Sequence, residues 1–288
     1  MLIAQISDPH ITEKGKKAYG IAPSNDNLAR TILHINRFKP KIDVVLVSGD
    51  IANDCLLKET QHAQSLLNEL NCPYYIVPGN HDDRENLFSV FGGKAIPAIP
   101  SVENSFINYV VEEYDVRLIG MDSVKENSPG GEICQTRLQW LSECLAREPH
   151  KPTIIFMHHP PIKCSVLETD IDGFEGAEEF GELIAKFSNI KAIICGHIHL
   201  PTHSLWNGSI VSTAPSTGMQ LGLDLSMQKQ SEFYLNETGY RLHHFTKHKD
   251  LISHTIYVRE NNDGPYPFIE HRDGSLANEA AQELKNEQ

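Results

Sequence analysis

The sequence predicts a layered α/β fold in which β-sheets pack against each other and helices cover the outside. Three observations lead to this prediction. Short apolar runs alternate with segments of helical periodicity over residues 1–195, and from residue 209 onward the chain is strand-like. The chain has 288 residues, of which 40% are hydrophobic, so it is long enough to bury a large core.

Several segments carry apolar residues at the spacing of a helix face. In residues 27–38, Leu28, Ile32 and Ile35 fall on one face, and Pro40 follows the expected end of the helix. The later segments show the same pattern. The predicted helices cover residues 27–38, 59–70, 135–147 and 177–187.

Short apolar runs between these helices read as strands. Residues 44–47 are rich in β-branched side chains, which is typical of a buried strand. Pro78 and Gly79 end the run 74–77, and a hairpin is expected around Glu113 and Tyr114. The predicted strands cover residues 2–6, 44–47, 74–77, 106–111, 116–121, 153–157, 191–195, 209–213, 232–235, 241–245 and 253–258.

Composition excludes several classes of function. A formal net charge of −13 and a pI near 5.6 argue against binding of nucleic-acid polymers or anionic lipid, because phosphate contacts need clustered Lys and Arg. The six cysteines form no CxxC pair, so free thiols in a reducing compartment are expected. The N-terminal MLIAQIS has no basic region typical of a signal peptide, and no stretch approaches the roughly 20 apolar residues of a membrane span. We therefore expect a cytoplasmic protein.

Polar clusters follow five of the predicted strands directly. In open α/β sheets, ligands bind beyond the carboxyl ends of the strands, so these clusters are expected to converge on one place. Other histidines lack this context, and we expect no catalytic part for His34, His62, His243, His244, His248, His254 and His271. The clusters are Asp8-Pro9-His10, Gly49-Asp50, Gly79-Asn80-His81-Asp82, His158-His159 and Gly196-His197-Ile198-His199.

These residue types favour a metal centre. Carboxylates, neutral imidazoles and amide oxygens are all metal ligands. Side chains two residues apart on an extended segment point the same way, so Asp-x-His and His-x-His can each present two ligands to one region. Each motif alone is weak, since it also suits a turn or a surface segment. Together they suit two ions bridged by one carboxylate. The candidate ligands are Asp8, His10, Asp50, Asn80, His158, His197 and His199.

The order of the motifs is similar to that of the calcineurin-like metallophosphoesterase superfamily. The resemblance covers about residues 1–220 and is strongest to class III cyclic-nucleotide phosphodiesterases and the related glycerophosphodiesterases. Residues 6–10 and 17–20 resemble the glycerophosphodiesterase opening, whereas residues 213–217 with Gln220 resemble the cyclic-nucleotide branch. The resemblance implies a four-layer α-β-β-α sandwich with two mixed β-sheets flanked by helices, plus a C-terminal strand-rich cap.

The resemblance also implies a role for each site residue. Asp8, His10 and His199 would hold one ion, and Asn80, His158 and His197 would hold the other. Asp50 would bridge both ions. His81 would contact the scissile phosphate and protonate a leaving oxygen. Asp82 would orient His81 or cap a helix, His159 would have a supporting role, and Met219 stands where some relatives place a histidine. The expected cofactors are two divalent ions from among Mn, Fe, Zn and Co.

The expected function is hydrolysis of small phosphodiesters, either 3',5'-cyclic nucleotides such as cAMP or glycerophosphodiesters, by a hydroxide held between the ions. A nuclease, a broad-specificity phosphomonoesterase and a non-catalytic binding module remain alternatives. We expect a catalytic domain over residues 1–222, a cap and dimerisation segment over 223–273, and a polar tail over 274–288. Exposed strand edges in the cap favour a homodimer or higher homo-oligomer.

Overall fold

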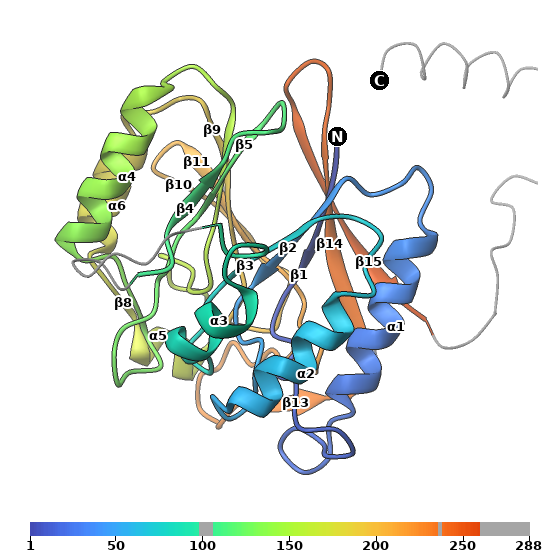
Figure 1. Cartoon of the computed structure of the whole chain (residues 1–288). Coiled ribbons are helices and arrows are strands. Elements are labelled where there is room, and N and C mark those ends of the chain that lie inside the picture. The colour runs from blue at the N-terminus through green and yellow to red at the C-terminus, as the bar shows by residue number, and fades with distance from the viewer. Residues whose placement is uncertain (98–105, 236–237, 260–288) are drawn as a thin grey trace, which may run out of the picture.

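Two β-sheets face each other at the centre of the molecule, and helices cover the outer face of each (Figure 1). This arrangement is seen in a computed structural model that describes residues 1–97, 106–235 and 238–259. It confirms the predicted four-layer α-β-β-α sandwich. No helix among these described residues is long and apolar enough to span a membrane.

The first sheet has five strands and joins the two ends of the described chain. Strands β1, β2 and β3 are parallel to one another, and β3 forms one edge of the sheet. β14 pairs antiparallel with β1, and β15 forms the other edge beside β14. The spatial order is β15 (Leu251–Val258), β14 (Thr238–Phe245), β1 (Leu2–Ile6), β2 (Val44–Ser48) and β3 (Tyr74–Val77).

The second sheet has six strands, of which the four central ones are parallel. The two edge strands, β10 and β4, are antiparallel to their neighbours. The spatial order is β10 (His203–Trp206), β11 (Ser209–Thr213), β9 (Ile190–Cys195), β7 (Thr153–Phe156), β5 (Arg117–Gly120) and β4 (Tyr109–Val111).

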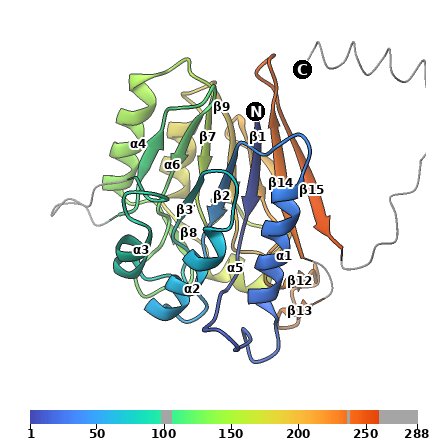
Figure 2. The same cartoon turned by 45° about the vertical axis from the view of Figure 1, so that its right-hand side comes forward.

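Helices form the two outer layers. Figure 2 shows α1 and α2 on the side of the first sheet and α4 and α6 on the side of the second. α3 packs beside α2, and the short α5 precedes β8 (Phe174–Glu175), which pairs with β6 (Gly131–Glu132). The helices are α1 (Ser24–Arg37), α2 (Leu57–Leu67), α3 (Arg84–Phe91), α4 (Gln135–Arg147), α5 (Leu167–Asp172) and α6 (Ala177–Ile184).

The period-two alternation of β-strands builds the core between these layers. In β7, Ile154 belongs to the cluster between the two sheets, whereas Ile155 belongs to the cluster under α4 and α6. Ile194 and Ile193 of β9 divide in the same way. Both faces of the parallel strands are therefore buried, which explains why these strands read as continuous apolar runs.

The C-terminal part of the chain differs from the expectation in one respect. β14 and β15 complete the first sheet, whereas β12 (Gln220–Gly222) pairs with β13 (Glu232–Tyr234) in a separate two-stranded sheet. Local periodicity predicts a strand but not its partner, and the partner β1 lies more than 200 residues away. The rest of the predicted cap, residues 260–273, and the tail 274–288 lie outside the described residues.

Candidate metal centre

The predicted ligands converge where loops from both sheets meet. The loops that follow β1, β2 and β3 come from the first sheet, and the loops that follow β7 and β9 come from the second. Asp8, His10, Asp50 and His158 are buried, while the other three predicted ligands are partly buried. The strand-end pattern in the sequence therefore predicted a real convergence in space.

The backbone of these loops is strained at the candidate ligands. Asp8, His10, Asp50, His197 and His199 all have positive φ values, between 44° and 73°. Non-glycine residues adopt this left-handed region rarely, and such residues cluster at functional sites. Backbone hydrogen bonds between neighbouring loops hold the conformation, since the amide of His10 donates to the carbonyl of Asp50 at 3.0 Å.

Two glycines leave room for the ligand side chains. A Cβ atom at Gly49 would lie 2.4 Å from Nδ1 of His158, and Gly49 itself has a φ of +89°. A Cβ atom at Gly196 would lie 2.8 Å from Oδ2 of Asp8. Any larger residue at these positions would push a candidate ligand away.

One group of ligands surrounds a first possible ion position. Four side chains each offer one atom that could bind a metal ion, and these atoms all lie within 4.8 Å of one another. The four residues are Asp8, His10, Asp50 and His199. Nε2 of His199 lies 3.1 Å from Nε2 of His10 and 3.5 Å from Oδ1 of Asp8. Nδ1 of His199 donates to the carbonyl of Met219 at 3.0 Å, which leaves the Nε2 lone pair facing the group.

A second group lies on the other side of Asp50. Nδ1 of His158 donates to the carbonyl of Ser48 at 2.8 Å, so its Nε2 faces inward. That Nε2 lies 3.1 Å from Oδ1 of Asn80 and 3.4 Å from Oδ1 of Asp50. The ring of His197 packs against that of His158, with the centroids 5.1 Å apart.

Asp50 stands between the two groups. Its Oδ2 lies 3.6 Å from Nε2 of His10, and its Oδ1 faces His158. One carboxylate thus presents an oxygen to each set of ligands. This is the arrangement that a bridging ligand between two ions requires.

The charges of the site also fit cations. Burial lowers the pKa of His10 and of His197 to about 3, so both imidazoles are neutral and keep a lone pair for a metal. Burial opposes ionisation of Asp50, but the neighbouring His158 holds the pKa of that carboxyl well below its usual range. Nδ1 of His10 is a buried atom without a hydrogen-bond partner among the described residues. Burial opposes protonation of His158, but the neighbouring Asp50 raises the pKa of that imidazole to about 9, so a metal would have to displace a proton from His158. Ionised carboxylates beside the neutral imidazoles of His10 and His197 suit divalent metals.

His159 lies near the second group but is held elsewhere. It clusters with His158 and His197. However, its Nδ1 lies 2.9 Å from Oγ of Ser123 and its Nε2 lies 3.1 Å from the carbonyl of Pro129. Both ring nitrogens are engaged in hydrogen bonds, which agrees with the expected supporting role.

Hydrogen bonds to the surrounding backbone orient His81 toward the cleft into which the candidate ligands open. Its Nδ1 donates to the carbonyl of Asn53 at 2.7 Å, and its amide donates to Oδ1 of Asp50 at 2.9 Å. His81 lines the cleft beside the ligands, and its Nε2 has no hydrogen-bond partner within the described part of the chain. This leaves Nε2 available to a substrate.

Asp82 was expected to orient His81 or to cap a helix, but its contacts differ from both expectations. Its carboxylate accepts hydrogen bonds from the amides of Gly79, Ile51 and Ala52 at 2.9–3.1 Å. The carboxylate forms no hydrogen bond to His81, and the capping prediction is wrong, because Asp83 caps α3 by accepting from the amide of Asn86. Asp82 instead joins the loop that carries Asp50 to the loop that carries Asn80.

The ligands open into a cleft of about 190 Å³. Its outer wall includes residues that the sequence did not single out, namely Glu168 at the start of α5 and Ser231 before β13. The amide of Ser231 donates to Oε1 of Glu168 at 2.8 Å. No local motif marks these two residues, because they meet only through the fold.

Sequence comparison identifies the family. The model of the calcineurin-like phosphoesterases matches residues 1–201. The chain belongs to the calcineurin-like phosphoesterase family. Members of this family use a binuclear divalent metal site, which the two groups around Asp50 fit.

Named relatives share most of the chain's length. The "Probable glycerophosphodiester phosphodiesterase GpdQ" of Arcobacter nitrofigilis is 37% identical over 93% of this chain and 97% of its own. The 3',5'-cyclic adenosine monophosphate phosphodiesterase CpdA of Escherichia coli K12 is 27% identical over 76% of each chain. Among solved structures, a dimetal phosphatase from Danio rerio shares the fold, with a TM-score of 0.64 and 17% identity over 90% of this chain and 99% of its own.

Proposed function

We propose that this chain is a metal-dependent phosphodiesterase that hydrolyses small phosphodiesters, with glycerophosphodiesters as its main substrates. The Arcobacter relative named for that activity is 37% identical and matches 97% of its length, whereas the cyclic-nucleotide relative is 27% identical over 76%. These similarities favour glycerophosphodiesters over cyclic nucleotides.

The position of Asp50 between two ligand groups is the observation that carries this proposal. Asp8, His10 and His199 would hold one ion, Asn80, His158 and His197 would hold the other, and Asp50 would bridge them. Bound ions would supply an activated water for attack on phosphorus and positive charge for the phosphoryl oxygens.

The chain's own groups would complete the reaction. Nε2 of His81 faces the cleft, and because Nδ1 already carries the proton donated to Asn53, Nε2 holds a proton only in the imidazolium form. From that form, Nε2 would donate its proton to the departing ester oxygen and leave a neutral imidazole. The hydrogen bond from Nδ1 of His81 to Asn53 fixes which nitrogen carries out that transfer. Asp82 would keep Asp50 and Asn80 at their mutual distance by joining the two loops.

The competing functions are less well supported. The cleft of about 190 Å³ and the formal charge of −13 suit a small substrate better than a nucleic-acid polymer. A binding module would not need seven ligands together with His81. A phosphomonoesterase would hydrolyse a monoester faster than a diester, and this difference is measurable.

Finer features of the protein follow from the same proposal. A mixed set of nitrogen and oxygen ligands accepts Mn, Fe, Zn and Co, and we propose Mn²⁺ as a sufficient activator.

Exposed apolar side chains around the β12–β13 hairpin support a homodimer that forms through the cap. They are Leu223, Leu225, Phe233 and Tyr234. All six cysteines are free, which supports a reducing, cytoplasmic location.

A substrate panel tests the proposal. Purified protein with Mn²⁺ is assayed with a glycerophosphodiester, cAMP, cGMP, bis(p-nitrophenyl) phosphate, p-nitrophenyl phosphate and single-stranded DNA. We expect the highest kcat/KM with the glycerophosphodiester, and no activity in Asn80→Ala protein purified in parallel. A higher kcat/KM with cAMP, with the monoester or with DNA would replace the proposed substrate class, and inactivity with all of them would favour a binding module.

A further inference from the structure

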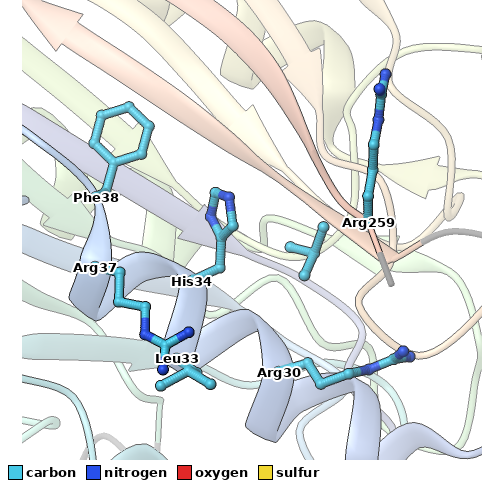
Figure 3. Close-up of a pocket in the computed structure, with 7 residues that line it drawn as sticks. Arg30, Leu33, His34, Arg37, Phe38 and Arg259 are labelled. Atoms are coloured by element: carbon cyan, nitrogen blue, oxygen red, sulfur yellow. The ribbon is translucent and has the colours of Figure 1, made fainter. Parts of the chain in front are cut away.

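A groove of about 600 Å³ lies between α1 and β15, away from the metal centre (Figure 3). Among the residues that the structure describes, it shares no lining residue with the metal cleft. One wall is the face of α1 that carries Arg30, Leu33 and Arg37, which are spaced three and four residues apart. The other wall is the end of β15, at Val258 and Arg259.

The groove is basic in a strongly acidic protein. Arg30, Arg37 and Arg259 line it, although the chain has a formal charge of −13. Neither Arg37 nor Arg259 forms an ion pair with any carboxylate that the structure describes, while Arg30 donates to Asn27 at 2.5 Å and has a further partner. The guanidinium groups of Arg37 and Arg259, which have no matching carboxylate in the described part of the chain, favour an anionic partner.

The lining of the groove also includes apolar side chains. Leu33 is 47% exposed, and Phe38 and Val258 lie beside it. His34 adds no fixed charge, because burial lowers the pKa of its imidazole and its Nδ1 lies 3.2 Å from the hydroxyl of Tyr240. The partner should therefore combine negative charge with apolar side chains.

The chain continues from the groove into a segment with this chemistry. Residues 260–288 follow Arg259 directly and contain seven acidic and two basic side chains, a formal charge of −5. Tyr266, Phe268 and Ile269 lie seven to ten residues beyond Arg259. A chain of this length reaches at most about 35 Å, at roughly 3.5 Å per residue, which is enough to place the aromatic residues over Leu33 and Phe38.

We propose that the acidic segment 260–288 binds to the groove between α1 and β15 of its own chain. Carboxylates of the segment pair with Arg37 and Arg259, and its aromatic residues cover Leu33. Because the segment is tethered at Arg259, binding is intramolecular and does not depend on protein concentration. This interaction is independent of the proposed activity.

Limited trypsin digestion of the full chain tests the proposal, with cleavage after Arg272 followed by mass spectrometry. In Arg37→Glu protein we expect cleavage to be about fivefold faster, the factor expected for loss of one partly exposed ion pair. Leu33→Ser should accelerate cleavage similarly. The matched controls are Arg147→Glu on α4 and Leu205→Ser on β10, which change exposed residues outside the groove. Circular dichroism spectra and thermal unfolding of all four variants check that they fold.

The possible results distinguish a groove occupied by the chain's own segment from a groove that is empty or occupied by a second copy. Faster cleavage in both groove variants, unchanged cleavage in both controls and rates that do not vary over tenfold dilution would support the proposal. Equal cleavage rates in the wild type and in both groove variants would overturn it. Cleavage of the wild type that becomes faster on dilution would also overturn the proposal, because the segment of a second copy would then occupy the groove.

Discussion

Oδ1 of Asp50 occupies the space that a side chain at Gly79 would need. A Cβ atom at position 79 would lie 2.2 Å from that oxygen. Gly79→Ala should therefore displace the bridging carboxylate and weaken activation by Mn²⁺ about 10- to 100-fold, as changes around metal ligands do. Titration of activity with Mn²⁺ measures the effect. Wild-type affinity in this variant would mean that Asp50 does not bind metal in the position seen here.

His81 should matter most when the leaving group is poor. A p-nitrophenolate leaves without a proton, whereas an alkoxide needs one, so His81→Ala should lower kcat about 100-fold for an alkyl ester and much less for an aryl ester. Mn²⁺ content should stay at the wild-type level, because His81 is not one of the seven ligands. Equal losses for the two esters would argue against proton donation by His81.

Asp82 should act through the loops that it joins. In Asp82→Asn, one of the three amides of Gly79, Ile51 and Ala52 would face an NH₂ group, and Mn²⁺ affinity should fall about tenfold. Asp83→Asn is the matched control, because Asn caps a helix about as well as Asp. Isothermal titration with Mn²⁺ compares the two variants, and equal affinities would refute the positioning role.

The sequence predicted which side chains converge better than it predicted the contacts around them. Asp8, Asp50 and His158 could be found because each follows a strand, and strand ends converge in α/β sheets. The contacts of Asp82 could not be found, because they depend on the distance between two loops. The short helices α3 and α5 were also missed, since eight and six residues carry too little periodicity.

Pairings between distant strands were equally out of reach. β14 and β15 were expected in a cap, yet His243 of β14 lies in the core, with Nε2 3.1 Å from Oε1 of Gln5 in β1. An apolar–polar pattern shows that a strand has a buried face, but it does not identify the neighbour.

His243 should make stability depend on pH. Burial lowers its pKa from 6.5 to about 3, so the folded chain keeps it neutral while the unfolded chain protonates it below pH 6.5. Its contribution to the free energy of unfolding is thus present above pH 6.5 and is lost as the pH falls toward 3. Between pH 7 and pH 5 the loss is about 2 kcal/mol.

Urea unfolding with EDTA at the two pH values measures this effect. The difference between pH 7 and pH 5 should be about 2 kcal/mol smaller in His243→Gln than in the wild type, because only the wild type carries this buried imidazole. His248→Gln, at an exposed position, is the control. An unchanged difference in His243→Gln would show that His243 does not stay neutral in the folded chain.

The number of Mn²⁺ ions bound per chain at saturation tests the central claim most directly. Equilibrium dialysis followed by metal analysis should give about two ions for the wild type and about one for Asn80→Ala, because Asn80 belongs to only one of the two ligand groups. A single ion in the wild type, or an unchanged count in Asn80→Ala, would contradict a pair of cations held around Asp50.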